Sequence, residues 1–440
     1  MIKQAFINAI LLKQRNLFPR RYPSAIERRK LLYRFKTSLL LKTLKKTQFF
    51  ELTAQKVIQE RRMQRLFSHM YRSSRFWQEY LRESGISPPF INSIDQLHRL
   101  PLLSREYVRS RDLKSLLIFD NTDTIHRATT GSSGEPFHIY WSARDYQSWT
   151  AYYLRALPEM FAFPLLRYQF TLLLGFTQEN WPAGHLAQLM NAKSVQYAPH
   201  YVLYGYTSLI KDLALTQEHP HLDFVIAAAE YLDIENRKWL EDYFKVPVRR
   251  YYGMRDGGWI AWECGYQDNV MHINSERVIV EVVNERGDSV LDERGEIILT
   301  ILDSWRMPLI RYQIGDTGIL KSAACPCGIR LPLLEFIGRN IEVVYLPNRK
   351  AIPVIELQGP IIDSVSGIVK IQIKQASYNK VLVYLIPQNN QAPQQDQLNI
   401  LKRRMEDVLE KQVSVEITIV KELPETINGK QPFFIPLSFE

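Results

Sequence analysis

The spacing of hydrophobic residues changes along the chain, and each change predicts a different kind of structure. Between residues 54 and 118, apolar residues recur at helical spacing. From residue 120 to 337, short strand-like runs alternate with helical stretches, which predicts a mixed α/β body. The clearest runs in this body are the predicted strands Phe170–Leu174, Phe224–Ala227, Val278–Val283 and Glu296–Leu302 and the predicted helix Glu235–Phe244.

The residues after Gly338 predict a compact α+β unit of about a hundred residues, which is a usual size for a domain. Its predicted elements are strands near Val343–Leu346, Val369–Ile373, Val381–Ile386 and Val415–Val420 and a helix at Leu398–Lys411. We therefore expect an α/β protein with three parts. These are a basic helical extension (1–53), a large mixed α/β N-terminal domain (54–337) and a small α+β C-terminal domain (338–440).

The composition is that of a globular protein. Apolar residues make up 46% of the chain and charged residues 23%, which excludes a wholly disordered chain. No uncharged apolar run approaches the roughly 18 residues that a membrane span needs. Three cysteines cannot form a disulfide framework and indicate a reducing compartment or a metal site. We expect a cytoplasmic protein.

The positive charge belongs to one end of the chain. Residues 1–50 carry 13 Lys and Arg side chains and one acid, Glu27. The whole chain has a net charge of +10, so the remaining residues sum to −2. Apolar residues at helical spacing, among them Leu31, Phe35 and Leu39, predict that this segment is helical. It either packs on the body or binds a membrane surface or an acidic partner, which would make the location peripheral. Nucleic acid is not expected as a partner, because no binding motif accompanies the charge.

A loop rich in glycine and hydroxyl side chains occupies residues 128–137, with the sequence ATTGSSGEPF. Its backbone N–H groups and hydroxyls could surround phosphate oxygens. The loop lacks the GxxxxGK[ST] pattern of a Walker A motif, and an ordinary turn has the same composition.

Two further motifs place glycine beside groups that suit a nucleotide. In YYGMRDGG (residues 251–258), an aromatic ring next to glycine can stack on a base, and Asp256 could bind Mg²⁺. In PLIRYQIGD, Asp316 directly follows glycine and could accept hydrogen bonds from a ribose diol. Two cations also follow a glycine, Arg339 and Lys430, and Arg339 could pair with phosphate or ribose. Taken singly, each motif is as well explained by a turn or a solvated charge.

The order of the motifs is more specific than any one of them. TTGSSGEPF, AAE ending at Glu230, YYGMRDGG, PLIRYQIGD, GR and NGK together resemble the adenylate-forming (acyl-activating) enzymes. The chain is most similar to their phenylacetate-CoA ligase and CapK-like branch, over roughly residues 54–440 and including CPCG at 325–328. The resemblance implies an AMP-forming acid–CoA ligase. Such an enzyme activates a carboxylic acid with ATP as an acyl-adenylate and transfers the acyl group to CoA, and its small C-terminal domain is mobile.

The resemblance also implies which residues bind ATP. The loop would close over the phosphates, a second group would line the adenine site, and a third would bind the ribose hydroxyls. In that order these residues are Thr129, Thr130, Gly131, Ser132, Ser133 and Gly134, then Glu230, Tyr252 and Gly253, then Asp316 and Arg339.

Asp256 and Lys430 would be the catalytic residues. Lys430 would reach the substrate carboxylate and the α-phosphate, and Asp256 stands where the family has a Mg²⁺-binding Glu. Asp256 is one methylene shorter than that Glu, and residues 340–342 (NIE) replace the usual pair of hinge aspartates. Two alternatives remain open. One keeps the adenylation and transfers the acyl group to a carrier-protein thiol or an amine, and the other, with which these departures are consistent, is a nucleotide-binding scaffold without turnover.

All three cysteines lie beside motif regions. With one histidine they form a C-x₇-H…C-x-C set of ligands that suits tetrahedral Zn²⁺: Cys264, His272, Cys325 and Cys327. The sequence predicts a structural zinc site, and the alternative is three buried thiols beside a hydrogen-bonded histidine. The eight other histidines show no comparable clustering.

The acid substrate is identified only by class. Phe176, Trp181 and Tyr206 hint at a pocket for an aryl or fatty acid, although aromatic residues are more often core. The expected ligands are therefore a small carboxylic acid, ATP, Mg²⁺ and CoA, with a structural Zn²⁺.

Overall fold

The chain divides into two compact units. The larger comprises Met1–Tyr204, Pro220–Ala229 and Pro247–Ile337, and the smaller comprises Gly205–His219, Glu230–Val246 and Gly338–Glu440. The computed structural model describes residues 30–86, 91–118, 124–128, 138–161, 170–174, 201–216, 222–228, 232, 234–254, 257–284, 286–339, 343–348, 350–357, 360–361, 364–388, 391–423 and 432–437.

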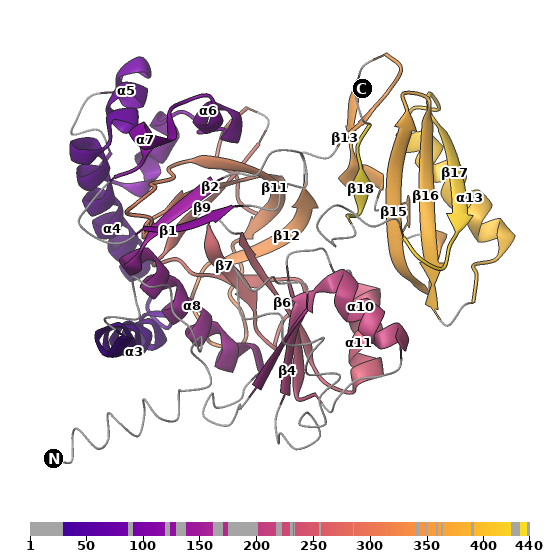
Figure 1. Cartoon of the computed structure of the whole chain (residues 1–440), viewed down its shortest axis with the longest axis horizontal. Helices are drawn as coiled ribbons and strands as arrows, with labels where there is room; N and C mark the ends of the chain where they lie inside the picture. Colours follow the sequence, from indigo (N-terminus) through magenta and orange to yellow (C-terminus); the bar gives the residue numbers. More distant parts are fainter. Residues whose placement is uncertain are drawn as a thin grey trace. The chain divides into compact units, whose positions relative to one another are not determined.

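A ten-stranded mixed sheet runs through the larger unit (Figure 1), with strand order β3-β4-β5-β6-β7-β8-β12-β11-β10-β9. Strands β5 and β6 pair in parallel, whereas the pairs β6–β7, β7–β8, β8–β12, β9–β10 and β10–β11 are antiparallel. The strands are β3 (Phe170–Leu174), β4 (Tyr201–Tyr206), β5 (Phe224–Ala228), β6 (Val248–Met254), β7 (Gly258–Glu263), β8 (Met271–Ile273), β9 (Val278–Val283), β10 (Gly295–Ile301), β11 (Tyr312–Lys321) and β12 (Leu333–Arg339). Every residue of β5 and β7 is buried, which explains their nearly continuous apolar sequences. The predicted mixed α/β class is confirmed.

Helices and a hairpin complete the described part of the larger unit. They are α3 (Lys30–Thr47), α4 (Leu52–Ser73), α5 (Arg75–Glu83), η1 (Ile94–Arg99), α6 (Arg105–Arg109), α7 (Leu113–Leu116), the β1–β2 hairpin (Thr124–Ala128, His138–Ser142) and α8 (Ala143–Phe161). Helix α8 contacts β7, and α3 packs on α8. The helical spacing of Met63, Leu66, Phe67 and Met70 places them on the buried side of α4. None of the described helices is long and apolar enough to span a bilayer.

The N-terminus of α8 is fixed by a reciprocal cap. The N–H of Ser142 donates to Asp145 Oδ2 at 2.7 Å, and the N–H of Asp145 donates to Ser142 Oγ at 3.3 Å. Asp145 Oδ1 also accepts from the N–H of Trp305 at 2.9 Å, which connects α8 to the loop after β10. Burial raises the pKa of Asp145 to about 6, although the three backbone and hydroxyl groups around it act in the opposite direction.

A buried ion pair joins α8 to the loop between β8 and β9. The Nη1 atom of Arg155 donates to both carboxylate oxygens of Glu276, at 2.8 and 3.0 Å, and both side chains are almost fully excluded from water. The hydroxyl of Thr47 in α3 donates to the same carboxylate at 2.5 Å. Arg62 in α4 donates to the carbonyl oxygen of Glu276 at 2.9 Å and to the hydroxyl of Tyr152 at 3.1 Å. Three helices are therefore joined at one residue, Glu276.

The smaller unit contains a four-stranded sheet with the order β17-β16-β15-β18. Its strands are β15 (Ile368–Ser377), β16 (Lys380–Pro387), β17 (Ser414–Ile419) and β18 (Phe434–Ile435), beside the hairpin β13–β14 (Val343–Tyr345, Ala351–Pro353) and the helices α10 (Thr207–Thr216), α11 (Ile234–Phe244), η4 (Val354–Leu357) and α13 (Gln395–Val408). Helices α10 and α11 belong to this unit through side chains that reach the start of β15. Lys211 Nζ donates to the Val369 carbonyl at 2.7 Å, and Asn236 Nδ2 donates to the Ile368 carbonyl at 3.1 Å.

Helix α13 lies three residues earlier at each end than the sequence predicts. It begins at Gln395 because Gln394 and Gln397 form a capping box, in which Gln397 Oε1 accepts from the N–H of Gln394 at 3.0 Å. It ends at Val408, and Glu410 and Lys411 then adopt φ angles of 55° and 57°, which no α-helix accommodates. Apolar spacing located this helix, but its ends are decided by backbone hydrogen bonds.

We predict that Arg155→Met lowers the free energy of unfolding by about 3–5 kcal/mol, because it leaves the Glu276 carboxylate buried without its cation. Urea unfolding followed by circular dichroism measures the loss. The matched control is Arg75→Met, which breaks the exposed i,i+4 pair with Glu79 and should leave the midpoint unchanged. Equal effects of the two substitutions would contradict the role given to the buried pair.

Candidate functional site

Two of the predicted nucleotide motifs meet at a buried hydrogen bond. Tyr252 on β6 donates its phenolic hydrogen to Asp316 Oδ2 on β11, with an O···O distance of 2.6 Å. Tyr252 is 7% exposed and Asp316 is 3% exposed. A buried polar group is costly to leave without its hydrogen-bond partner, so each residue fixes the position of the other. The fold thus brings together two positions that lie 64 residues apart in the chain.

Asp316 is positioned by an irregularity in its strand. Ile297 of β10 pairs with Asp316, but the next residue, Ile298, pairs with Gln313, so β11 bulges between these two rungs. Gly315 lies in this bulge with φ +73°, a conformation that side chains with a Cβ rarely adopt. The glycine of the IGD motif therefore sets the direction of the carboxylate that follows it.

Tyr252 is held from two further directions. Its ring stacks on Phe336 of β12, with ring centres 4.7 Å apart and planes inclined by 26°. The next residue, Gly253, stands where β6 turns into β7, and a Cβ there would lie 2.6 Å from the carbonyl oxygen of Gly258. Only glycine fits this approach of two backbones.

Most other predicted ATP-site residues lie outside the described part of the chain. These are Thr129, Thr130, Gly131, Ser132, Ser133, Gly134, Glu230, Asp256 and Lys430, together with Phe176 and Trp181 of the suggested acid pocket. Arg339 is the last residue of β12, and its side chain is also outside the description. Tyr206 ends β4 and is buried. Because β5 and β6 are parallel, their carboxyl ends lie at the same edge of the sheet, where ligands of open α/β sheets usually bind.

The four predicted zinc ligands converge. The ligand atoms of Cys264, His272, Cys325 and Cys327 all lie within 4.8 Å of one another. Cys264 Sγ is 3.4 Å from Cys325 Sγ, and Cys327 Sγ is 3.3 Å from His272 Nε2. A tetrahedral ion bound by thiolates holds its sulfur atoms roughly 3.8 Å apart, so these separations are of the size that Zn²⁺ requires.

The cluster is largely removed from water. Cys264, His272 and Cys325 are buried, and the imidazole of His272 lies beside the indole of Trp262. Burial raises the pKa of each of the three thiols, and it lowers the pKa of His272 to about 4. The imidazole is therefore neutral at pH 7, which is the form that binds metals. His272 of β8 pairs with Leu333 of β12. The cluster therefore joins the segment before β8, which contains Cys264, to the loop before β12, which contains Cys325 and Cys327.

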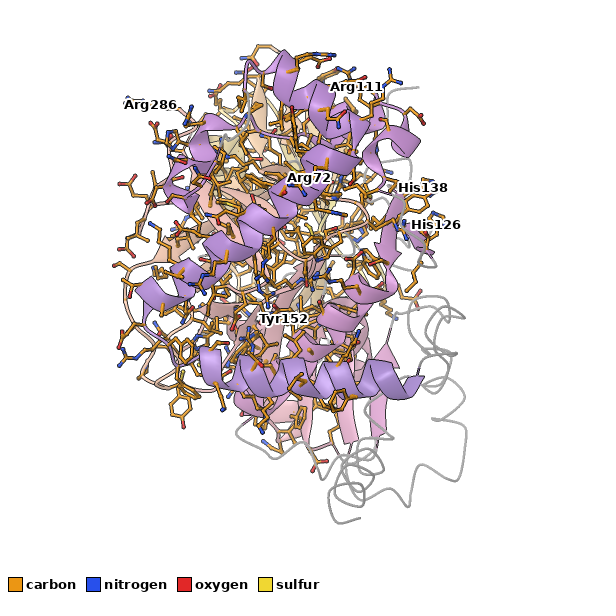
Figure 2. All side chains as sticks on the ribbon, turned by 90° about the vertical axis from the view of Figure 1, so that its left-hand side faces the viewer. Arg72, Arg111, His126, His138, Tyr152 and Arg286 are labelled. Carbon is orange, nitrogen blue, oxygen red and sulfur yellow. The ribbon has the colours of Figure 1, made fainter. Side chains whose placement is uncertain are left out.

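Two features of this region were not foreseen from the sequence. Phe336 supports Tyr252 but was not singled out, although it lies on the same face of β12 as Gly338 of the GR motif. The second feature is a pair of histidines. His126 and His138 lie side by side in the β1–β2 hairpin, with Nε2···Nδ1 at 2.8 Å and stacked rings (Figure 2). They are 12 residues apart in sequence, and only the pairing of Ala128 with His138 brings them together.

Comparisons with known proteins agree with this arrangement. Residues 344–436 match the family model of the CapK C-terminal domain. The chain is 23% identical over 326 residues to the phenylacetate-coenzyme A ligase of Thermus thermophilus, which covers 68% of this chain and 73% of that protein. It is 21% identical over 411 residues to Protein CapK of Staphylococcus aureus, which covers 86% and 88%. The predicted resemblance is confirmed.

The fold is similar to that of a solved CoA ligase. A crystal structure of 2-hydroxyisobutyryl-CoA ligase in the postadenylation state, in complex with R3-HIB-AMP, matches with a TM-score of 0.71 and 16% identity. The match covers 88% of this chain and 90% of the ligase chain. At this identity the comparison establishes the fold, including a C-terminal domain of the same kind.

We predict that Tyr252→Phe lowers the free energy of unfolding by roughly 1–3 kcal/mol, because the buried carboxyl group of Asp316 loses its hydrogen-bond donor while the ring remains on Phe336. Urea unfolding measures the change. Tyr266→Phe is the matched control, since Tyr266 is 65% exposed and its hydroxyl can bond to water. A Tyr252→Phe protein as stable as the control would show that the hydrogen bond does not hold the site together.

Proposed function

We propose that the protein is an AMP-forming acid–CoA ligase. The observation that carries this proposal is the contact between Tyr252 and Asp316, which joins two nucleotide motifs inside the fold of a CoA ligase. The phenylacetate-coenzyme A ligase and the 2-hydroxyisobutyryl-CoA ligase to which the chain is similar support the same activity, as the sequence predicted.

The proposed reaction has two steps. In the first, an oxygen of the substrate carboxylate attacks the α-phosphorus of ATP, the bond to the β-phosphate breaks, and pyrophosphate leaves with that electron pair. In the second, the sulfur of CoA attacks the acyl carbon, the bond to the adenylate oxygen breaks, and AMP leaves while the thiol proton is released. Neither step needs a covalent bond to the protein, so its contribution is to position the reactants and to neutralise charge.

The described residues fit the nucleotide side of this reaction. Asp316 has a carboxylate that could accept the two ribose hydroxyls, and its direction is fixed by Tyr252 and by the bulge at Gly315. The ring of Tyr252 and the bare backbone of Gly253 suit the approach of a flat base. We propose that Arg339 assists at the ribose and that Glu230 completes the adenine site.

The remaining roles follow from the motif order. Residues 129–134 would surround the phosphates, and Lys430 would stabilise the charge that develops between the carboxylate and the α-phosphate. Asp256 would bind Mg²⁺, which would offset the charge of the phosphates. We propose that the acid is aryl or fatty and that the location is cytoplasmic. The second step would require rotation of the C-terminal domain about the changed hinge at 340–342. A carrier-protein thiol or an amine is the alternative acceptor.

We also propose that the thiol–imidazole cluster holds a structural Zn²⁺. Three sulfur donors and one imidazole, all within 4.8 Å, make a complete tetrahedral set with no position left for substrate. The ion would link the segment after β7, strand β8 and the loop before β12, and would so stabilise the sheet that carries Tyr252 and Asp316.

Pyrophosphate release tests the proposed activity. A panel of aryl and fatty acids should give acid-dependent release with ATP and Mg²⁺, and CoA should increase it by accepting the acyl group. We expect Lys430→Ala to reduce release by about 10²-fold or more, since it removes a cation from the transition state. The matched control, Lys350→Ala, changes another lysine of the smaller unit, one that pairs with Glu410, and should retain activity.

The alternatives give different results in the same assay. Pyrophosphate release that increases with an amine or a carrier protein but not with CoA would identify that compound, and not CoA, as the acceptor. ATP binding without release for any acid would favour the nucleotide-binding scaffold and would contradict the ligase.

Metal analysis tests the zinc proposal. Protein purified without chelator should contain about one Zn²⁺ per chain, as a closed four-ligand site binds one ion. His272→Ala should lose the zinc and unfold at a lower temperature. His69→Ala, which affects a histidine bonded to the Trp305 carbonyl instead, should retain the metal. Unmodified protein without stoichiometric metal would favour three buried thiols.

A further inference from the structure

Apolar side chains face outward on α3 and at the corner between α3 and α4. Their exposed fractions are 52% for Phe35, 58% for Leu39, 51% for Phe49 and 43% for Phe50. The opposite side of α3 is packed, since Leu41 and Leu44 are buried. The helix therefore carries apolar residues on two sides, and only one of them is covered by the described protein.

Two lysines lie on the same outward side of α3. Lys42 follows Phe35 by seven residues, and Lys46 follows Leu39 by seven. Seven residues are about two helical turns, so each lysine projects from the same side of the helix as the apolar residue before it. Helix α3 contains no acidic residue. No described acid forms an ion pair with either lysine. We define the α3 face as Phe35, Leu39, Lys42, Lys46, Phe49 and Phe50.

The corner that carries the two phenylalanines is anchored on both sides. The carbonyl of Gln48 accepts from the N–H of Arg330 at 2.9 Å, and Gln55 Nε2 donates to the carbonyl of Arg330 at 3.0 Å and to that of Phe50 at 2.8 Å. Glu51 also pairs with the Arg330 guanidinium. Phe49 and Phe50 are therefore held outward by a well-bonded corner. Helices α3 and α4, on the left in Figure 1, cross the front of the view in Figure 2.

We propose that the α3 face docks the protein on the surface of an anionic lipid bilayer. Apolar side chains beside lysines, on a helix that lies along the surface, suit the boundary between headgroups and acyl chains. Phe35, Leu39 and the corner phenylalanines would enter the acyl boundary, while Lys42 and Lys46 would meet the headgroup phosphates. This inference goes beyond the proposed ligase activity and does not depend on it.

The charge on the face favours a membrane over other occupants. In a symmetric dimer each face would meet its own copy, and Lys42 and Lys46 would oppose lysines within an apolar contact. Stabilisation of the helix dipole explains lysines in the last turn of α3, but it does not explain the exposed apolar row. An anionic bilayer satisfies both the charge and the apolar side chains.

Co-sedimentation of the full chain with vesicles tests the proposal. The chain should pellet with vesicles of phosphatidylcholine and phosphatidylglycerol, less so at high salt, and should remain soluble with phosphatidylcholine alone. Leu39→Ser/Phe50→Ser and Lys42→Glu/Lys46→Glu should each weaken binding by about tenfold or more. These side chains are exposed, so the variants should keep the thermal midpoint of the unmodified chain.

Matched controls change the same kinds of residue elsewhere. Tyr266→Ser/Leu291→Ser removes two exposed apolar side chains, and Lys374→Glu/Arg403→Glu makes the same change in charge. Both controls should bind like the unmodified chain. The proposal is overturned if the unmodified chain does not pellet with anionic vesicles, or if the α3-face variants bind as the controls do. Self-association or binding to polyglutamate that depends on this face, without vesicle binding, would assign it to a second copy or an acidic protein.

Discussion

The Glu276 carboxylate is almost completely buried, so protein groups must replace the water that would otherwise solvate its charge. Arg155 of α8 supplies the opposite charge, and Thr47 of α3 donates a further hydrogen bond. Both helices must therefore be docked before the carboxylate is satisfied, and Arg62 of α4 binds the same residue through its carbonyl. Because Glu276 lies two residues before the start of β9, its contacts attach the helical layer to the sheet.

Both the candidate nucleotide site and the α3 face depend on that attachment. The sheet carries Tyr252 and Asp316, whose hydrogen bond requires β6 and β11 to keep their places across the intervening strands. On the helical side, the same docking buries one side of α3 and leaves the other outward. The loop that contributes Cys325 and Cys327 continues to Arg330, which hydrogen-bonds to the α3–α4 corner. The thiol–imidazole cluster and the α3 face therefore depend on the same loop.

The sequence predicted the parts of this arrangement that leave a local or ordered signal. The alternation of strand-like and helical runs was enough to predict the α/β class. The order of the glycine-containing motifs, two of which contain Tyr252 and Asp316, indicated the resemblance to the adenylate-forming enzymes. The four Cys and His side chains were predicted as metal ligands because the chain has only three cysteines and all of them lie beside motif regions. Contacts that depend on register were missed: neither Phe336 beneath Tyr252 nor the His126–His138 pair has a signal in spacing. The ends of α13 were misplaced, since capping and positive φ angles decide them.

The central claim is that the protein forms an acyl-adenylate and passes the acyl group to CoA. The most direct measurement is mass spectrometry of enzyme incubated with ATP, Mg²⁺ and each acid of an aryl and fatty panel, first without CoA and then after its addition. The account predicts an acyl-AMP for at least one acid, which disappears when CoA is added as the acyl-CoA and AMP appear. An enzyme that binds ATP but yields no acyl-AMP with any acid, or an acyl-AMP that CoA does not consume, would contradict it.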